Sequence, residues 1–434
     1  MPSLPIKAAG ALAAAYLLIP AMATAATPAA QDTLLIPERV ISLSGSTDKA
    51  KDLIAILYNR QELHHSDPSA PRFLFVDSKG RVALGIGGYV KGSVQYDFRG
   101  SINDGSSFTT YDIPVPSDPA QREAFFANAN HSTLFLQMLG RTDHFGTYEM
   151  YIQTNFSGGG PGAYGLKLKQ AYLRLGYVTA GLTNSTFVDG AAGTPTIDDQ
   201  GPSGEVGAKN ILLQYRPRLT EHITAAVSVE NPSASYTLDD NVKAISQRVP
   251  DIPVFIQYAW GGGESHVRLS ALLRNLSYRD LVAGTNRFAT GWAAQLSGAI
   301  SFAPAFRLYY QGAYGHGYGR YVNDLAEADA DLIPCADKAG RMHAPAMSNF
   351  ELGLQYNFSP KAYIAGAYSQ AHLYEATHLG PDTYKRGQYV TVSGFYNIIS
   401  DFTIGLEYLH GSRTNVDHSH GSANRVMGMM KLSF

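Results

Sequence analysis

The chain has 434 residues, a formal net charge of −2 at pH 7 and a single cysteine, Cys335. The near-neutral charge argues against a nucleic-acid-binding protein, and one cysteine excludes an intrachain disulfide. The mean hydropathy is −0.13, and no run of about 20 apolar residues follows the first two dozen, which excludes a helical membrane protein beyond that point. A chain with only 16% charged residues, 27 Tyr and 43 Gly is also atypical of a soluble enzyme.

The first 25 residues have the features of a secretory signal peptide. Lys7 supplies a positive charge, and Ala8 to Ile19 form an apolar segment. Ala21-Met22-Ala23 or Ala23-Thr24-Ala25 supplies a small-residue cleavage site. We therefore expect residues 1–25 to be a signal peptide and the chain to be exported.

Residues 26–80 are expected to form a small periplasmic extension. A short amphipathic helix is predicted between Asp48 and Gln61, with Leu53, Ile54, Leu57 and Tyr58 on one side. The run from His64 to Pro71 contains two prolines and ends this helix. Because so short a helix is marginal alone, it should pack on the rim of the main domain or on copies of itself in an oligomer.

Residues 81–434 alternate between apolar and polar side chains. In the first segment Val90, Val94 and Phe98 share one face, whereas Lys91 and Asp97 share the other. Similar segments follow at 132–141, 146–156, 165–178, 180–187, 207–217, 222–231, 252–261, 266–278, 287–302, 305–316, 348–358, 361–372, 385–398, 401–411 and 424–434. The chain is therefore predicted to be all-β, with a transmembrane antiparallel barrel of about 16 strands after a short helical extension.

The connections between these segments alternate in length. Tight links are predicted at 261–264, 303–304 and 359–360, and long polar loops at 99–130, 188–206, 232–251, 318–346 and 412–423. Aromatic residues such as Trp260, Trp292 and Tyr408 gather near strand ends, as interfacial girdles require. Short periplasmic turns, long external loops and aromatic girdles are the pattern of outer-membrane barrels.

The last segment, Arg425 to Phe434, is predicted to be the closing strand. Val426, Met430 and Leu432 fall on one face and Arg425 and Lys431 on the other. In a closed barrel this strand pairs with the first, so that no edge remains. The segment also resembles the C-terminal strand of Gram-negative outer-membrane barrels, which ends on Phe. The alternative is an ordinary terminal strand of a soluble β-sandwich.

The third external loop, 188–206, is expected to fold into the barrel and narrow it. It follows the fifth predicted strand, and its Gly and Pro content allows a compact fold inside a lumen. Its acidic residues Asp189, Asp198 and Asp199 are assigned to the constriction. The alternative is an ordinary surface loop.

Two stretches carry a resemblance to a known family. Arg174 with its strand, the run from Gly181 to Asp189, and Gly201-Pro202 resemble the DcaP-like outer-membrane porins. The run from Leu84 to Lys91, preceded by Ala70 to Phe75, is similar to members with an N-terminal extension. The resemblance implies a sixteen-stranded homotrimeric porin that favours small anionic solutes such as dicarboxylates.

The inward face of the predicted strands carries more basic than acidic residues. The basic set is Lys91, Arg174, Arg216, Arg268, Arg274, Arg287, Arg307, Arg425 and Lys431, and the acidic set is Asp97, Glu149, Glu230, Glu351 and Glu407. Nine against five favours anions, because fixed charges in a narrow channel set the local potential. Arg216, Arg307 and Lys431 are expected near the periplasmic rim, so the pore lining is assigned to Lys91, Arg174, Arg268, Arg274, Arg287 and Arg425. Each could equally be a structural partner of a lumen carboxylate.

The constriction should form where loop 188–206 meets this wall. We expect the loop carboxylates to face Arg174, Arg268 and Arg274, with Lys91 and Arg425 meeting across the closing seam. Arg174 is the first choice for the residue that sets selectivity.

The function predicted from these features is passive, mildly anion-favouring diffusion of small hydrophilic solutes, including carboxylates, across a Gram-negative outer membrane. Membrane lipid and a homotrimer are the expected partners, with no nucleic acid. Asp417-His418-Ser419-His420 has metal-ligand residue types, but an exposed solvated loop is the favoured interpretation, so neither a metal nor a cofactor is expected. No enzyme activity is expected either; the alternatives are a lipase- or protease-type barrel enzyme and an adhesin or structural barrel plugged by its loops.

Overall fold

The structure is a computed structural model, and it describes residues 41–44, 51–58, 63–100, 102, 107–117, 123–159, 163–376 and 378–434. The predicted signal peptide lies outside the described residues, as do residues 26–40 of the predicted extension.

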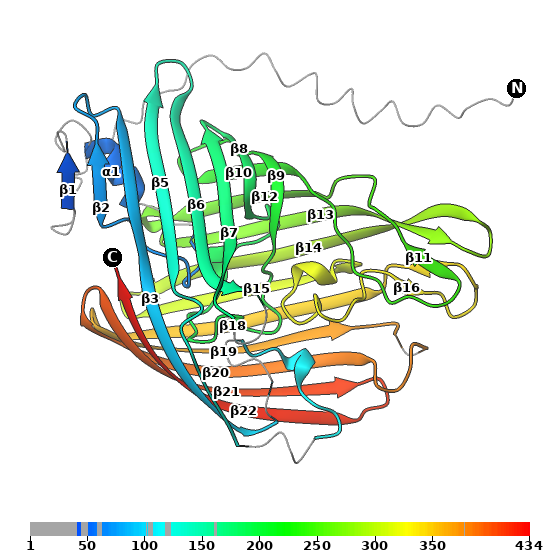
Figure 1. Cartoon of the computed structure of the whole chain (residues 1–434). Coiled ribbons are helices and arrows are strands. Elements are labelled where there is room, and N and C mark those ends of the chain that lie inside the picture. Colours follow the sequence, from blue (N-terminus) through cyan, green and yellow to red (C-terminus); the bar gives the residue numbers. More distant parts are fainter. Residues whose placement is uncertain are drawn as a thin grey trace, which may run out of the picture. The chain divides into compact units, whose positions relative to one another are not determined.

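A closed antiparallel β-barrel of sixteen strands makes up most of the fold (Figure 1). Each strand pairs with the next along the barrel, and the last pairs with the first, β22 with β3. The barrel strands are β3 (Val82–Arg99), β5 (Thr133–Thr142), β6 (Gly146–Gly158), β7 (Gly165–Leu175), β8 (Val178–Asn184), β9 (Lys209–Tyr215), β10 (Ile223–Glu230), β12 (Ile252–Trp260), β13 (Ser265–Asp280), β14 (Thr285–Ala303), β15 (Phe306–His316), β18 (Ala346–Ser359), β19 (Ala362–Leu373), β20 (Tyr384–Ile399), β21 (Phe402–Asn415) and β22 (His420–Ser433). The predicted architecture is confirmed.

Shorter strands and helices lie outside the sixteen-strand ladder, and several of them pair with a barrel strand. β2 and β4 pair with β3, β11 pairs with β13, β1 pairs in parallel with β2, and β16 pairs with β17. These elements and the helices are β1 (Ile41–Ser44), α1 (Lys51–Tyr58), β2 (Phe73–Val76), η2 (Thr110–Asp112), β4 (Ala124–Asn128), η3 (Gly190–Ala192), β11 (Val242–Ala244), η4 (Gly261–Gly263), η5 (Gly319–Tyr321), β16 (Ile333–Pro334) and β17 (Met342–His343). Among the residues that the structure describes, no helix is long and apolar enough to cross a membrane.

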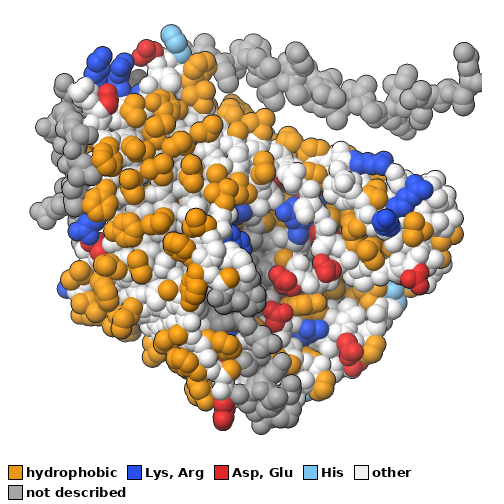
Figure 2. Space-filling model, in the orientation of Figure 1, with side chains coloured by type: hydrophobic (Ala, Val, Ile, Leu, Met, Phe, Trp, Pro, Cys, Tyr) orange, Lys and Arg blue, Asp and Glu red, His pale blue; other side chains and the backbone are white. Residues whose placement is uncertain are grey.

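The alternation of side chains separates the two faces of the wall. On β3, Val90, Val94 and Phe98 are exposed on the outer face, whereas Lys91 and Asp97 are buried inside. Figure 2 shows hydrophobic side chains spread over the outside of the wall. Because successive residues of a strand point to opposite faces, one alternating sequence supplies both an apolar outer surface and a polar interior.

The last strand closes the barrel as predicted. β22 pairs with β3 in a register that joins Leu432 to Val90 and Val426 to Tyr96. The final residue continues this ladder, because Phe434 N donates to Gly88 O and Gly88 N to Phe434 O, both at 2.9 Å. The interpretation as a β-sandwich strand is therefore excluded.

The two ends of the barrel differ in their connections. Tight turns link β7 to β8, β14 to β15 and β18 to β19 at one end, here called the short-turn end. The opposite, long-loop end carries three loops that matter below: L3 (185–208), L4 (231–251) and L6 (317–345). The prediction of a long loop at 412–423 is wrong, since β21 runs to Asn415 and β22 starts at His420. Continued pairing between these strands satisfies backbone groups that a loop would leave to water.

Helix α1 packs against the inner side of the wall near the short-turn end. Leu53, Ile54 and Leu57 are fully buried and cluster with Leu74 of β2 and Leu139 of β5. Burying each of these side chains contributes about 2 kcal/mol. Such packing stabilises a helix of eight residues that would be marginal alone. The predicted apolar side of this helix is confirmed.

Candidate functional site

Loop L3 crosses the interior of the barrel and is bonded to its far wall. Thr194 N and Oγ1 donate to Glu351 Oε1 of β18 at 2.9 and 2.6 Å. Ile197 N and Asp198 N donate to the carboxylate of Glu407 on β21 at 2.6 and 3.0 Å. Buried carboxylates thus satisfy backbone N–H groups that would otherwise lie unpaired in the interior. L3 is therefore folded inward and is not a surface loop.

The near end of L3 is tied to β13 and β14. Arg268 Nη1 donates to Val188 O at 2.8 Å. Asp189 Oδ2 lies 2.9 Å from His266 Nε2 and accepts from Ser297 Oγ at 2.7 Å. Burial disfavours the charged form of Asp189, but Arg268 and the bonds from His266 and Ser297 outweigh it and hold the pKa of this carboxyl below its ordinary value. Asp189 therefore holds the loop to the wall as a carboxylate.

The other two aspartates of L3 lie near the closing seam. Asp199 Oδ1 is 2.6 Å from Lys91 Nζ. Asp198 accepts from Phe108 N at 3.0 Å and from Tyr389 Oη at 3.1 Å. Burial, reinforced by nearby Glu407, raises the pKa of Asp198 well above its ordinary value. The three loop aspartates thus act as contacts between L3 and its surroundings.

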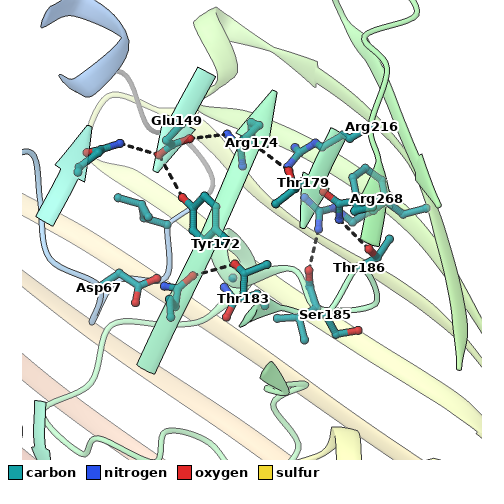
Figure 3. Close-up of a pocket in the computed structure, with 18 of the residues that line it drawn as sticks. Asp67, Glu149, Tyr172, Arg174, Thr179, Thr183, Ser185, Thr186, Arg216 and Arg268 are labelled. Atoms are coloured by element: carbon teal, nitrogen blue, oxygen red, sulfur yellow. Dashed lines mark hydrogen bonds and ion pairs between the residues drawn. The ribbon is translucent and has the colours of Figure 1, made fainter. Parts of the chain in front are cut away.

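A cavity of about 270 Å³ lies between L3 and the wall formed by β5 to β9, β12 and β13. Figure 3 shows three arginines that line it from this wall, Arg174 of β7, Arg268 of β13 and Arg216 beside β9. The side chain of Arg174 is 40% exposed. Among the described lining residues the acidic groups are Glu149 and Asp67. The cavity is therefore lined by three arginines and two acidic residues, of which Arg268 and Glu149 are buried and Arg174 is partly exposed.

Hydrogen bonds hold the wall side chains of this cavity in place. Glu149 accepts from Gln137 Nε2 at 2.7 Å and from Tyr172 Oη at 3.1 Å, and its second oxygen lies 3.1 Å from Arg174 Nη1. Arg174 Nε also donates to Thr179 Oγ1 at 3.1 Å (Figure 3). Arg174 is thus oriented along the wall with part of its guanidinium facing the cavity.

The remaining basic residues assigned to the pore lining have carboxylate partners and do not line this cavity. Arg274 Nε lies 3.1 Å from Asp251 of L4, and its Nη1 lies 3.0 Å from Asp331 of L6. Arg425 Nε is 2.6 Å from Asp97 across the seam. Arg287 pairs with Asp280 at 2.7 Å near the long-loop end.

The expected contact between the L3 carboxylates and three arginines is therefore only partly right. Arg268 meets Asp189, at 3.7 Å. Arg174 contacts Glu149 instead, and Arg274 contacts loops L4 and L6. The expectation failed because facing loops and strands, whose positions depend on the whole barrel, supply the nearest carboxylates.

Loop L6 was missed as an interior element. Its Tyr318, Tyr321 and Leu325 are fully buried and cluster with Phe187 of L3. The Tyr321 and Phe187 rings meet edge to face, with their centroids 5.8 Å apart. The signal available in the sequence was a set of apolar residues, including Leu325 and Leu332, inside a loop otherwise expected to be solvated.

The comparisons with known proteins agree with this geometry. The model of the porin subfamily matches residues 84–428. The fold is similar to the outer membrane channel DcaP of Acinetobacter baumannii, with 19% identity, a TM-score of 0.71 and coverage of 82% of this chain and 99% of DcaP. It is also similar to OmpF of Salmonella typhi, with 11% identity, a TM-score of 0.54 and coverage of 83% and 99%. A third similar structure is the outer membrane protein OmpT of Vibrio cholerae, with 10% identity, a TM-score of 0.51 and coverage of 81% and 98%. No curated protein gives a significant match.

A closed barrel with an apolar outer face, a polar interior and an inward-folded loop defines an outer-membrane β-barrel channel. The chain belongs to the porin subfamily, and the resemblance to DcaP-like porins predicted from its sequence is confirmed.

Proposed function

We propose that this porin gives passive, mildly anion-favouring diffusion of small hydrophilic solutes, including carboxylates. The observation that carries the proposal is the placement of three arginines on one wall of the cavity beside L3. Arg174, Arg216 and Arg268 line this cavity together, against Glu149 and Asp67. Fixed positive charges in a confined space attract anions and repel cations, and the partly exposed Arg174 is the clearest such charge here.

The arrangement of L3 supports the same preference. Asp189, Asp198 and Asp199 are buried or held by partners from the wall and from residues 107–117. Asp189 is thus directed at His266, Asp199 at Lys91 and Asp198 at the backbone N–H of Phe108. Because charges in water are screened over about 8 Å at physiological salt, the groups beside the cavity dominate its potential.

The assembly and the processing of the chain belong to the same proposal. Residues 1–25 act as a signal peptide, and residues 26–80 form an extension at the periplasmic end whose helix α1 and segment Leu63–Asp67 reach into the barrel. The barrel of 81–434 assembles as a homotrimer in outer-membrane lipid. The similarity of the fold to the trimer form of OmpT of Vibrio cholerae supports the last point.

A second candidate is a structural barrel plugged by its loops. It is favoured by the amount of loop packed inside, since residues 107–117, L3 and L6 all contribute to buried clusters. A planar-bilayer recording in a salt gradient separates the two. The proposal expects conductance steps and a reversal potential on the anion side. A cation-side reversal potential would overturn the selectivity, and a barrel without conductance would favour the plug.

A further inference from the structure

The segment Leu63–Asp67, which precedes the barrel, lies inside it against L3. His64 Nε2 is 2.7 Å from Glu205 Oε1 of L3. Thr196 N of L3 donates to His65 Nε2 at 3.2 Å. Tyr89 Oη, on the inner face of β3, donates to Ser66 O at 3.1 Å. Three consecutive residues of this segment therefore bond to L3 or to the inner wall.

The segment is held in a compact turn. Asp67 N donates to His64 O at 2.9 Å, and Asp67 Oδ2 accepts from His64 N at 3.2 Å. His64 Nδ1 lies 2.6 Å from Ser66 Oγ. Helix α1 is packed on the wall before this turn and β2 is paired with β3 after it. The turn is therefore anchored on both sides and has few conformations to lose on binding L3.

Gly193 of L3 marks how closely the two segments approach. Its φ of −75° is one that any residue adopts, so its backbone does not require glycine. A Cβ at this position would lie 2.9 Å from both His64 Nε2 and Glu205 Oε1. The contact between His64 and Glu205 therefore occupies the space that a side chain at position 193 would need, which explains the glycine.

The segment separates two cavities. Leu63 and Asp67 line the cavity of about 270 Å³ beside Arg174. His65 and Ser66 line a second cavity of about 70 Å³, whose wall comes from β3 and β19 to β22. L3 also borders both, with Val188 on the first and Thr196 on the second. Neighbouring residues of one turn therefore face different sides of the lumen.

We infer that Leu63–Asp67 and L3 together form a partition across the lumen, so that the N-terminal segment sets the size limit of the channel together with L3. Solutes then follow the side bounded by β5 to β9, and the smaller cavity behind the partition is excluded from the path. His64 is the positioning residue, because its bond to Glu205 holds the turn against the loop. The inference rests on L3 as the narrowing element of the proposed function but is independent of ion preference.

The test is the single-channel conductance of His64→Ala, Glu205→Ala and the double variant, in the full chain. Each single variant removes the same contact, so each should raise the conductance and the double variant should add little. Gly193→Ala keeps every polar group but should break the same contact, because its methyl group would displace the His64 ring. Ser69→Ala is the matched control, because Ser69 is exposed and follows the same turn; its conductance should equal that of the wild type.

Liposome swelling with neutral sugars of increasing size is the second measurement. Loss of the partition should speed the entry of larger sugars more than that of small ones, with the reversal potential in a salt gradient nearly unchanged. Heat-modifiable gel mobility verifies that each variant is a folded barrel. Wild-type conductance and wild-type sugar discrimination in all folded variants would overturn the inference. A cation-selective wild type would overturn the proposed function and leave the partition intact.

Discussion

At the scale of single residues, the arginines inside the barrel lie in two kinds of environment. Arg174 is partly exposed to the cavity, whereas Arg274 and Arg425 are fully buried beside carboxylates. An exposed cation acts on passing ions through water, while a buried one offsets the desolvation of its partner. The two kinds should respond differently to substitution.

Arg174→Ala should move the reversal potential toward cations. The change removes one positive charge and leaves Glu149 beside the cavity without this partner. A unit charge about 4 Å from an ion in water is worth about 1 kcal/mol. The anion loses this attraction and the cation loses the same repulsion, so the anion-to-cation permeability ratio should fall by up to about 30-fold at low salt. The effect should shrink as salt rises.

Arg287→Ala is the control for this measurement, because Arg287 pairs with Asp280 near the long-loop end and does not line the cavity. Equal shifts from Arg174→Ala and Arg287→Ala would mean that the cavity beside L3 does not set selectivity.

Arg425→Ala should destabilise the barrel. Arg425 and Asp97 bond across the β22–β3 seam with almost no solvent exposure. Removing one partner of a buried pair leaves an uncompensated charge and costs about 3–5 kcal/mol. Urea unfolding followed by gel mobility should show a lower midpoint, and Arg425→Met combined with Asp97→Leu should recover part of the loss. An unchanged midpoint in Arg425→Ala would show that the pair does not stabilise the seam.

At the scale of elements, the interior loops hold one another. Asp324 of L6 accepts from Thr110 N at 3.2 Å and from Tyr384 Oη at 3.2 Å, and it also bonds the Thr110 hydroxyl. It therefore joins L6 to η2 and to strand β20. Burial raises the pKa of Asp324 to about 7.

This junction should weaken as the pH rises. The folded state keeps the Asp324 proton up to about pH 7, whereas the unfolded chain releases it near pH 4. Because the folded state binds more protons in this window, the free energy of unfolding falls by at most about 4 kcal/mol between about pH 4 and about pH 7. It is level at higher pH. The protection factors for hydrogen exchange, which correct for the faster intrinsic exchange at high pH, should be lower at pH 8 than at pH 5 for residues 107–117 and 320–330.

Asp324→Asn, which imitates the protonated acid, is the matched variant for this experiment. It should remove most of the pH dependence of the protection factors in both segments. A pH dependence that survives the substitution would assign the effect to another group.

At the scale of the whole molecule, the outer face of the barrel is apolar around its wall, and part of it should be covered by other copies. Cross-linking in native outer membranes should trap a trimer, and mild detergent should preserve it. His64→Ala should leave the trimer intact, since His64 lies within the barrel beside L3. Cross-linking that stops at a monomer would contradict the proposed assembly.

The sequence by itself determined the barrel. The alternation of apolar and polar side chains in segments such as 82–98 indicates which face of each strand contacts lipid, because apolar side chains must lie outside the barrel and polar ones inside. The strand count and the closure of β22 on β3 follow from the same local pattern. The pattern failed at 412–423, where polar residues continue in the paired strands β21 and β22 and so resemble a loop.

Only the tertiary structure decided what fills the barrel. The bond between His64 and Glu205 joins residues 141 positions apart, and Arg274 meets carboxylates from two different loops. Loops L3 and L6 have no repeating pattern that fixes their path, so their position depends on which buried carboxylates and backbone groups they satisfy across the lumen. Strand order is encoded by local periodicity, whereas the width and charge of the channel arise from these long-range contacts.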